Sequence, residues 1–402
     1  MPTNGSETSP ASTSLPPGDY LSRDALVANL KRFVAYPSEQ SALHERDPAV
    51  IGFIKNCAAP LLDQMQATYR YDDMGNLILE AGPKGTGRSL LLVGYAMTHP
   101  GAAMTDPFSP RLVTTPRGEA LRGRGVAEQK TALAALFGAV GKALAGDELK
   151  GRLIITLLTA GETGRHDAAD SVMKQLDETP NCAVVCLGTD NRIAVSNKGR
   201  IDFNIIVGGK AAHSSVPAQG INAITGAQRI LQQFEGIEIG VPDHPVFGRA
   251  TLTPTAIDSS PKATHTVPDQ VRITFDRRLL PGEDPEAAYK AIISKFSLPQ
   301  PWSLTFERGP VMYPNELSLK GPFFAKLTAA FDAAGQGKPE TFACNFALDA
   351  GYFSRKGIEA IMLGPGEVDQ FHSSEEQVLI SDLVAMANVY YQLIRHCVGP
   401  DC

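Results

Sequence analysis

Four side chains of the kinds that bind metal ions stand beside segments that resemble strands or helices. His99 directly precedes a proline, Glu128 lies just ahead of a helix-length segment, Glu162 follows the apolar run 153–158, and His372 lies near the C-terminus. Metal-dependent hydrolases with α/β folds take carboxylate and imidazole ligands from loops at the carboxyl ends of strands, where distant parts of a chain meet. These residues are therefore the first candidates for the chemistry of this protein.

The elements that would position these residues follow an alternating pattern. Four apolar runs have the length of buried strands: 90–93, 153–158, 183–187 and 360–363. They alternate with helix-length segments such as 130–145 and 379–394. Such alternation predicts a layered α/β domain with a largely parallel sheet.

The pattern changes between Arg200 and Arg308. There the expected order is strand, helix, strand, strand, helix, strand, at 201–207, 221–234, 250–256, 271–276, 285–296 and 303–307. This order predicts a ferredoxin-like insert. We therefore expect a catalytic domain made of residues 19–199 and 312–402, interrupted by a second domain at 200–311.

Charge and hydropathy narrow the classes of partner. The chain of 402 residues has a formal net charge of -6 and no run rich in Lys or Arg, so no binding to nucleic acid or to a membrane surface is predicted. No apolar run approaches the roughly 18 residues that span a bilayer. A small-molecule partner is expected instead.

The N-terminus and the cysteines indicate the compartment. Residues 1–18 are rich in Ser, Thr, Pro and Gly and lack the apolar stretch of a signal peptide, which predicts a disordered tail. The six cysteines are scattered, which favours reduced thiols and a cytoplasmic protein. Cys182 and Cys186 lie in or beside an apolar run with no second Cys/His pair nearby, so we expect core thiols rather than metal ligands.

Several short motifs, in order along the chain, resemble those of one metallopeptidase family. They lie at 94–100, 121–130, 159–164, 209–215, 276–283 and 371–376. The family includes acetylornithine deacetylase, succinyl-diaminopimelate desuccinylase, aminoacylase and bacterial glutamate carboxypeptidase, and the resemblance covers nearly everything after residue 20. It implies an α/β fold, with a zinc-peptidase-like three-layer catalytic domain and an inserted ferredoxin-like (β-α-β-β-α-β) lid and dimerisation domain.

The resemblance also implies a site for two metal ions, from which this sequence departs. The family's first metal-binding His falls on Tyr95, and the Asp that supports it falls on Met97. An acidic ligand of the same metal falls on Leu187, and the general base, the first Glu of a Glu-Glu pair, falls on Gly161. We therefore expect the first metal site to be lost.

The ligands of the family's second metal are retained, on Glu128, Glu162 and His372. This set predicts one divalent metal ion (Mn, Zn, Co or Fe) with open coordination positions. Asp190 and His99 are candidates to replace part of the first site. Each retained ligand also has a structural explanation: Glu128 stands at the start of a helix, Glu162 in a polar turn, and His372 at the cap of a loop. The prediction of a metal therefore depends on all three residues matching the family's ligands together.

The lid carries residues that the resemblance assigns to substrate and catalysis. His213 falls on the histidine that reaches across a dimer to stabilise a developing oxyanion. Arg278 falls on the arginine that binds the substrate carboxylate, for which a planar guanidinium is suited. His265 stands where the family has an Asn, and Arg277 is expected to be a solvated neighbour. We expect a homodimer or higher homo-oligomer assembled through the lids.

Further residues are expected around the substrate. Gly364 and Gly366 would line the carboxylate pocket with backbone, although such a triplet also forms turns. His99 would contact the substrate. Tyr95 would take part in catalysis or pack beside the site.

Three functions are compatible with this site. An ordinary two-metal peptidase or deacylase is disfavoured because Tyr95, Leu187 and Gly161 stand at positions of the family's metal ligands and general base. A metal-free binding relative is disfavoured because random loss of function would change the ligands of both metals, whereas here the changes cluster at the first metal and the base. We expect a single-metal hydrolase of a C–N bond in a small carboxylate-bearing substrate. Hydrolytic deamination of an aminoarene carboxylate such as 5-nitroanthranilate, known from one member of the family, is the specific expectation, with N-acyl amino acid deacylase or dipeptidase as the alternative.

Overall fold

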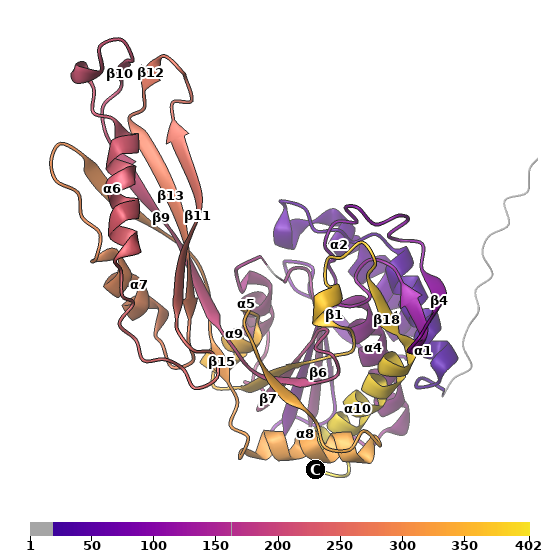
Figure 1. Ribbon diagram of the computed structural model, residues 1–402. Coiled ribbons are helices and arrows are strands. Elements are labelled where there is room, and N and C mark those ends of the chain that lie inside the picture. Colours follow the sequence, from indigo (N-terminus) through magenta and orange to yellow (C-terminus); the bar gives the residue numbers. More distant parts are fainter. Residues whose placement is uncertain (1–18, 162) are drawn as a thin grey trace, which may run out of the picture.

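The computed structural model describes residues 19–161 and 163–402, so the tail expected at 1–18 lies outside the described residues. Figure 1 shows a broad domain built around one large sheet and an elongated second domain that projects from it. We propose the same domain boundaries as above for these two parts. None of the helices in the described part of the chain combines the length and apolar character needed to cross a membrane.

The large sheet of the catalytic domain has nine strands and mixed directions. Its order is β1-β2-β6-β3-β7-β17-β8-β15, with β16 paired to β8. The four predicted strands form the parallel centre (β6, Arg152–Leu158; β3, Ser89–Tyr95; β7, Cys182–Cys186; β17, Glu359–Leu363). The remaining strands are β1 (Tyr69–Tyr71), β2 (Leu77–Ala81), β8 (Ile193–Asn197), β15 (Asn315–Glu316) and β16 (Thr341–Cys344). Cys182 and Cys186 are buried within β7, as predicted.

Helices cover both faces of this sheet, which confirms the three-layer α/β fold. In Figure 1, α4 (Lys130–Gly146) and α10 (Ile380–Val398) lie on one side and α5 (Asp167–Lys174) and α9 (Ala350–Arg355) on the other. The other helices are α1 (Arg23–Ala35), α2 (Pro48–Phe53), α3 (Ala59–Gln64) and α8 (Pro322–Ala333). Gly94 lets α4 approach β3, since a Cβ there would lie 2.3 Å from Leu133 Cδ2.

A small antiparallel sheet stands beside this core. It consists of β4 (Arg111–Thr115), β5 (Gly118–Arg122) and β18 (Gln377–Leu379), in the order β18-β5-β4. Because β18 leads directly into α10, this sheet fixes the end of the loop that carries His372.

The lid has the predicted ferredoxin-like order. Its elements are β9 (Gly199–Gly208), α6 (Ala223–Glu235), β11 (Thr251–Ser260), β13 (Gln270–Leu279), α7 (Pro285–Ile293) and β14 (Ser303–Met312), and its antiparallel sheet has the order β11-β13-β9-β14. Alternate apolar residues of β9 and β13 face α6 and α7 and form a second hydrophobic core. A pair of short strands, β10 (Ala212–His213) and β12 (Thr266–Val267), lies at the tip far from the catalytic domain (Figure 1).

One side chain of the lid differs from expectation. Arg277, predicted to be solvated, is 1% exposed. It forms an ion pair with Glu283, and burial lowers the pKa of its guanidinium. Successive side chains of a strand point to opposite faces, so the placement of Arg278 on the open face sends Arg277 to the core face.

Candidate metal centre

His99, Glu128 and His372 come together at the edge of the large sheet. Their ligand atoms all lie within 4.8 Å of one another. His372 Nε2 is 3.3 Å from Glu128 Oε2, and the rings of His99 and His372 have centroids 3.6 Å apart. His372 has a φ of 61°, a conformation that residues other than glycine adopt rarely.

Each of the three side chains comes from a different loop. His99 follows β3, Glu128 lies two residues before α4, and His372 follows the short helix η4 (Val368–Gln370). Glu128 is 3% exposed, so its carboxylate is held in a largely dry environment beside two imidazoles. Two His and one Glu form the donor set of well-known catalytic zinc sites, which leave a coordination position open, and the same donors suit manganese, cobalt and iron. The arrangement fits a divalent metal ion.

The three loops are tied together by one buried ion pair. Glu376 accepts hydrogen bonds from the backbone N–H groups of Gly125 (3.0 Å) and Ala127 (2.8 Å) and from Arg124 Nη1 (2.9 Å). Arg124 Nη2 donates to the carbonyl of Gly101 at 3.0 Å. Burial raises the pKa of the Glu376 carboxyl, and these donors act in the opposite direction. The pair therefore connects the residues that flank all three candidate ligands.

The predicted ligand set is only partly described. Glu128 and His372 are brought together, whereas Glu162 lies outside the described residues. His99, predicted as a substrate contact and as a candidate to replace part of the first metal site, lies with these two residues. Asp190 is not part of this group among the described residues, because it accepts hydrogen bonds from Val368 N (2.9 Å) and Arg192 Nη2 (2.6 Å).

Tyr95 is enclosed beside the site rather than exposed in it. Its side chain is 1% exposed, and its hydroxyl donates to Asp349 Oδ2 at 2.6 Å. His166 Nδ1 lies 2.5 Å from the other oxygen of Asp349, and the backbone N–H of Tyr313 donates to His166 Nε2 at 3.3 Å. The Nδ1 of His166 therefore carries the proton and donates to Asp349. No sequence pattern pointed to Asp349 or His166, and a catalytic role for Tyr95 stays a prediction.

The other residues at the positions of the family's first metal site are apolar and packed. Met97 and Leu187 are each 1% exposed. The sulfur of Met97 accepts from Gln129 Nε2 at 3.6 Å. Both side chains therefore fill the core.

A cavity of about 300 Å³ links the metal centre to the lid. Glu128, His372, Phe371 and Met312 line it from the catalytic domain, and Arg278 and Arg200 line it from the lid. Arg278 donates from Nε to Asp276 Oδ1 at 2.8 Å. The structure thus places the expected carboxylate-binding arginine beside the candidate ligands, and it adds Arg200, which the sequence did not single out.

His213 and His265 lie together elsewhere, at the far tip of the lid (Figure 1). Their ring centroids are 6.0 Å apart, and both side chains are exposed. His213 Nδ1 lies 2.8 Å from Ser215 Oγ. Within one chain, these residues do not line the cavity of the metal centre.

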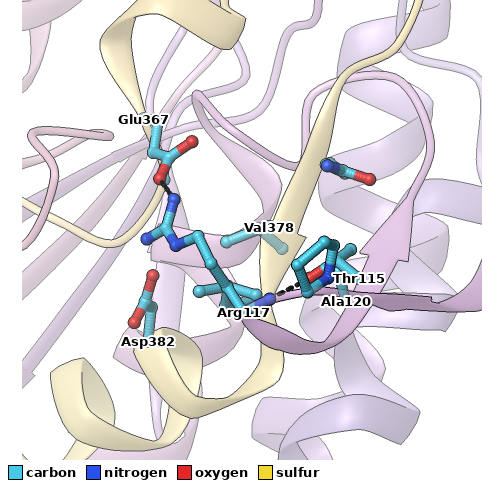
Figure 2. A pocket seen from close by; sticks show the side chains of 10 residues that line it. Thr115, Arg117, Ala120, Glu367, Val378 and Asp382 are labelled. Atoms are coloured by element: carbon cyan, nitrogen blue, oxygen red, sulfur yellow. Dashed lines mark hydrogen bonds and ion pairs between the residues drawn. The ribbon is translucent and has the colours of Figure 1, made fainter.

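Gly364 and Gly366 serve close packing. A Cβ on Gly364 would lie 2.3 Å from the carbonyl oxygen of Leu187, and one on Gly366 would lie 2.1 Å from that of Ala127. Gly366 also lines a separate cavity of about 200 Å³, where Arg117 forms an ion pair with Glu367 near Asp382 (Figure 2). Contact of these glycines with a substrate stays a prediction.

Comparison with known proteins shows which proteins this chain resembles. Residues 195–302 match the peptidase dimerisation domain family. The chain is 27% identical over 366 residues to acetylornithine deacetylase of Myxococcus xanthus, covering 85% of this chain and 92% of that protein. It is 23% identical to succinyl-diaminopimelate desuccinylase of Wolinella succinogenes, covering 92% of this chain and 100% of that protein. The chain is therefore similar to M20 metallopeptidases along most of its length, and its residues 195–302 match their dimerisation domain.

Solved M20 structures share this fold. The M20 family metallo-carboxypeptidase Sso-CP2 from Sulfolobus solfataricus superposes with a TM-score of 0.72 at 14% identity, covering 92% of this chain and 98% of that one. The YXEP protein of Bacillus subtilis, described as a dinuclear metal-binding M20 peptidase, has a TM-score of 0.63 at 15% identity, with coverage of 92% and 97%. Tyr95, Leu187 and Gly161 are departures from the family pattern that the sequence resembles.

Proposed function

We propose that this protein hydrolyses an amide C–N bond in a small carboxylate-bearing substrate, such as an N-acyl amino acid or a dipeptide, using one divalent metal ion per chain. The observation that carries the proposal is the shared cavity: Glu128 and His372 line it on one side and Arg278 on the other. A metal-binding group and a carboxylate-binding group are both required to hold such a substrate, and here they face the same space.

The side chains have distinct roles in this proposal. Arg278 grips the substrate carboxylate through its two terminal nitrogens, which sets the position of the neighbouring amide. Glu128, His372 and His99 would hold the ion, which polarises a carbonyl and activates water for attack at neutral pH. The apolar wall that includes Phe371 and Met312 limits water around the reacting bond.

A single ion is proposed because the first metal's ligand positions carry side chains that do not bind it. Leu187 has no donor, and Tyr95 directs its hydroxyl to Asp349. Metal analysis of the purified protein tests this count. Two tightly bound ions per chain would contradict it.

Assembly is proposed to be a homodimer through the lid, with His213 acting in the site of the partner. The match of residues 195–302 to the peptidase dimerisation domain family supports it. The exposed position of His213 at the lid tip also supports it, because within its own chain this side chain does not line the cavity. Sedimentation velocity tests the assembly, and a stable monomer at micromolar concentration would contradict it.

A second candidate reaction is hydrolytic deamination of an aminoarene carboxylate such as 5-nitroanthranilate. The observation that favours it is Gly161, which supplies no general base at the position where the family has a Glu. An activated aromatic ring needs less help from such a base than an amide does.

One assay separates these candidates. The protein, loaded in turn with Mn, Zn, Co and Fe, is incubated with N-acyl amino acids, dipeptides and aminoarene carboxylates. Release of a free amino acid supports the first proposal, and release of ammonia from an aminoarene supports the second. If every metal form is inactive and the protein retains no metal in dialysis, a metal-free binding function replaces both.

A further inference from the structure

Two arginines stand side by side where the lid meets the metal centre. Arg200 on β9 is the direct cross-strand partner of Arg278 on β13. Directly opposed residues project from the same face of a sheet, and both of these line the cavity that contains Glu128 and His372. Two guanidinium groups therefore face one substrate-sized space.

Two aspartates fix the orientation of these guanidinium groups. Asp202 and Asp276 form the neighbouring cross-strand pair on the same face. Asp202 Oδ2 accepts from Nη2 (2.6 Å) and Nε (3.1 Å) of Arg200, and Asp276 Oδ1 accepts from Nε of Arg278. Like charges directly opposite each other on a sheet repel. Here each arginine lies beside an aspartate of its own strand, so attraction between arginine and aspartate offsets the repulsion within the arginine pair and within the aspartate pair.

The aspartates leave part of each guanidinium to a ligand. Among the described residues, Arg278 uses only Nε, so both of its terminal nitrogens remain, and Arg200 retains Nη1. The side chains of Arg200 and Arg278 are 31% and 27% exposed, so they are reachable from the cavity but partly shielded from water. Charge-assisted hydrogen bonds are strong in such an environment.

One carboxylate does not need both arginines, because a planar guanidinium with two free terminal nitrogens binds a carboxylate by itself. We propose that Arg200 binds a second anionic group, so that the substrates of this protein carry two anionic groups. The proposal rests on the hydrolytic function proposed above. The substrate class is then an N-acylated acidic amino acid, an amino acid acylated by a dicarboxylic acid, or an acidic dipeptide.

Matched substrates test the proposal. The N-acetyl derivatives of aspartate and glutamate are compared with those of asparagine and glutamine, and N-succinyl-alanine is compared with N-butyryl-alanine. We expect the wild-type kcat/KM to favour the dianion of a pair by about 10-fold or more, the size of one charge-assisted hydrogen bond. Arg200→Gln should lower kcat/KM for the dianion about 10- to 100-fold and change that of the monoanionic partner by less than about 3-fold.

Control variants locate the effect. Arg272 lies on the same face of β13 and pairs with Glu307 outside the cavity, so Arg272→Gln should leave the preference unchanged. Arg278→Gln should lower kcat/KM for both substrates of a pair. If circular dichroism shows that Arg200→Gln does not fold, the double variant Arg200→Gln with Asp202→Asn is used instead. It removes both members of the ion pair and so leaves no aspartate without its partner.

A binding experiment separates this proposal from the proposed hydrolysis. Calorimetry measures the affinity of the full-length protein, with and without Mn, for glutarate and for valerate. We expect glutarate to bind about 10-fold tighter, and Arg200→Gln to remove that difference. Loss of the difference without turnover of any N-acyl substrate would overturn the hydrolytic function and keep the anion site. Turnover with equal kcat/KM for dianions and their monoanionic partners would overturn the anion site and keep the hydrolytic function.

Discussion

The ring of Tyr95 occupies the space that a side chain at Gly161 would need. A Cβ on Gly161 would lie 2.7 Å from both Cδ1 and Cε1 of Tyr95, closer than carbon atoms approach without strain. Position 95 carries a His and position 161 a Glu in the family pattern that this chain resembles. The two departures are therefore one steric unit: once Tyr95 fills this volume, a glycine is required at 161.

This relationship predicts the effect of a single methyl group. Gly161→Ala should lower the free energy of unfolding by about 1–3 kcal/mol, the usual cost of overpacking a dense core. Adding Tyr95→Ala should remove that penalty, giving a coupling of about 0.5–3 kcal/mol in a double-mutant cycle. Denaturation in urea measures each variant.

The control is Gly146→Ala, because a Cβ at Gly146 meets nothing closer than 3.8 Å. It should leave stability within about 0.5 kcal/mol. Equal costs for Gly161→Ala in the presence and absence of the Tyr95 ring would show that the ring does not exclude a side chain there.

The ion pair between Glu376 and Arg124 predicts a linked loss of metal affinity and stability. Glu376→Gln keeps the shape but leaves the Arg124 charge, which is 2% exposed, without its buried counter-charge. We expect metal affinity, measured by chelator competition, to fall about 10- to 100-fold. The free energy of unfolding should fall by about 3 kcal/mol or more.

The neighbouring residue provides the matched control for that variant. Glu375 is 70% exposed and pairs with Arg122, so Glu375→Gln should change stability by no more than about 0.5 kcal/mol. If Glu376→Gln kept full metal affinity, the pair would be a stabilising contact without influence on the ligands.

The parts of the fold that could be predicted from the sequence are those with a single strong pattern. The four central strands and α4 are continuous apolar runs because they are buried on both sides. The other strands are short and were not predicted; in β4, for example, none of the residues is buried. Arg277 was wrongly predicted to be solvated because the sequence does not distinguish it from the adjacent Arg278. Adjacent residues of a strand lie on opposite faces, so one of the two arginines must face the core.

The candidate site shows the same limit. Glu128 and His372 were identified because they stand in recognisable motifs. His99 was named only as a partial replacement at the first metal site and as a substrate contact, because no local pattern in the sequence shows that the loop after β3 meets the loop near the C-terminus. Arg200 was identified only from the strand register that pairs it with Arg278. That register could not be predicted, because pairing between β9 and β13 depends on packing across the whole lid.

The cluster of His99 with Glu128 and His372 predicts how metal removal acts. A bound ion stabilises the folded chain by mass action, so a chelator should lower Tm in wild type. His99→Ala should weaken metal affinity by about 10-fold or more and reduce the Tm change. His213→Ala, at the tip of the lid, should leave metal affinity unchanged. A His99→Ala protein with wild-type affinity would remove His99 from the ligand set.

The proposed action of His213 across the dimer can be tested by subunit mixing. His213→Ala and Glu128→Gln should each be inactive alone, because one lacks oxyanion stabilisation and the other lacks a metal ligand. In a hybrid dimer, the site with intact Glu128 receives His213 from the partner and becomes complete, whereas the other site lacks both. Random reassociation of equal amounts should restore about a quarter of wild-type activity, since half of the dimers are hybrids with one working site. The control is each variant unfolded and refolded alone, which should stay inactive. If His213 instead served the site of its own chain, each site of the hybrid would lack one group, and mixing would restore no activity.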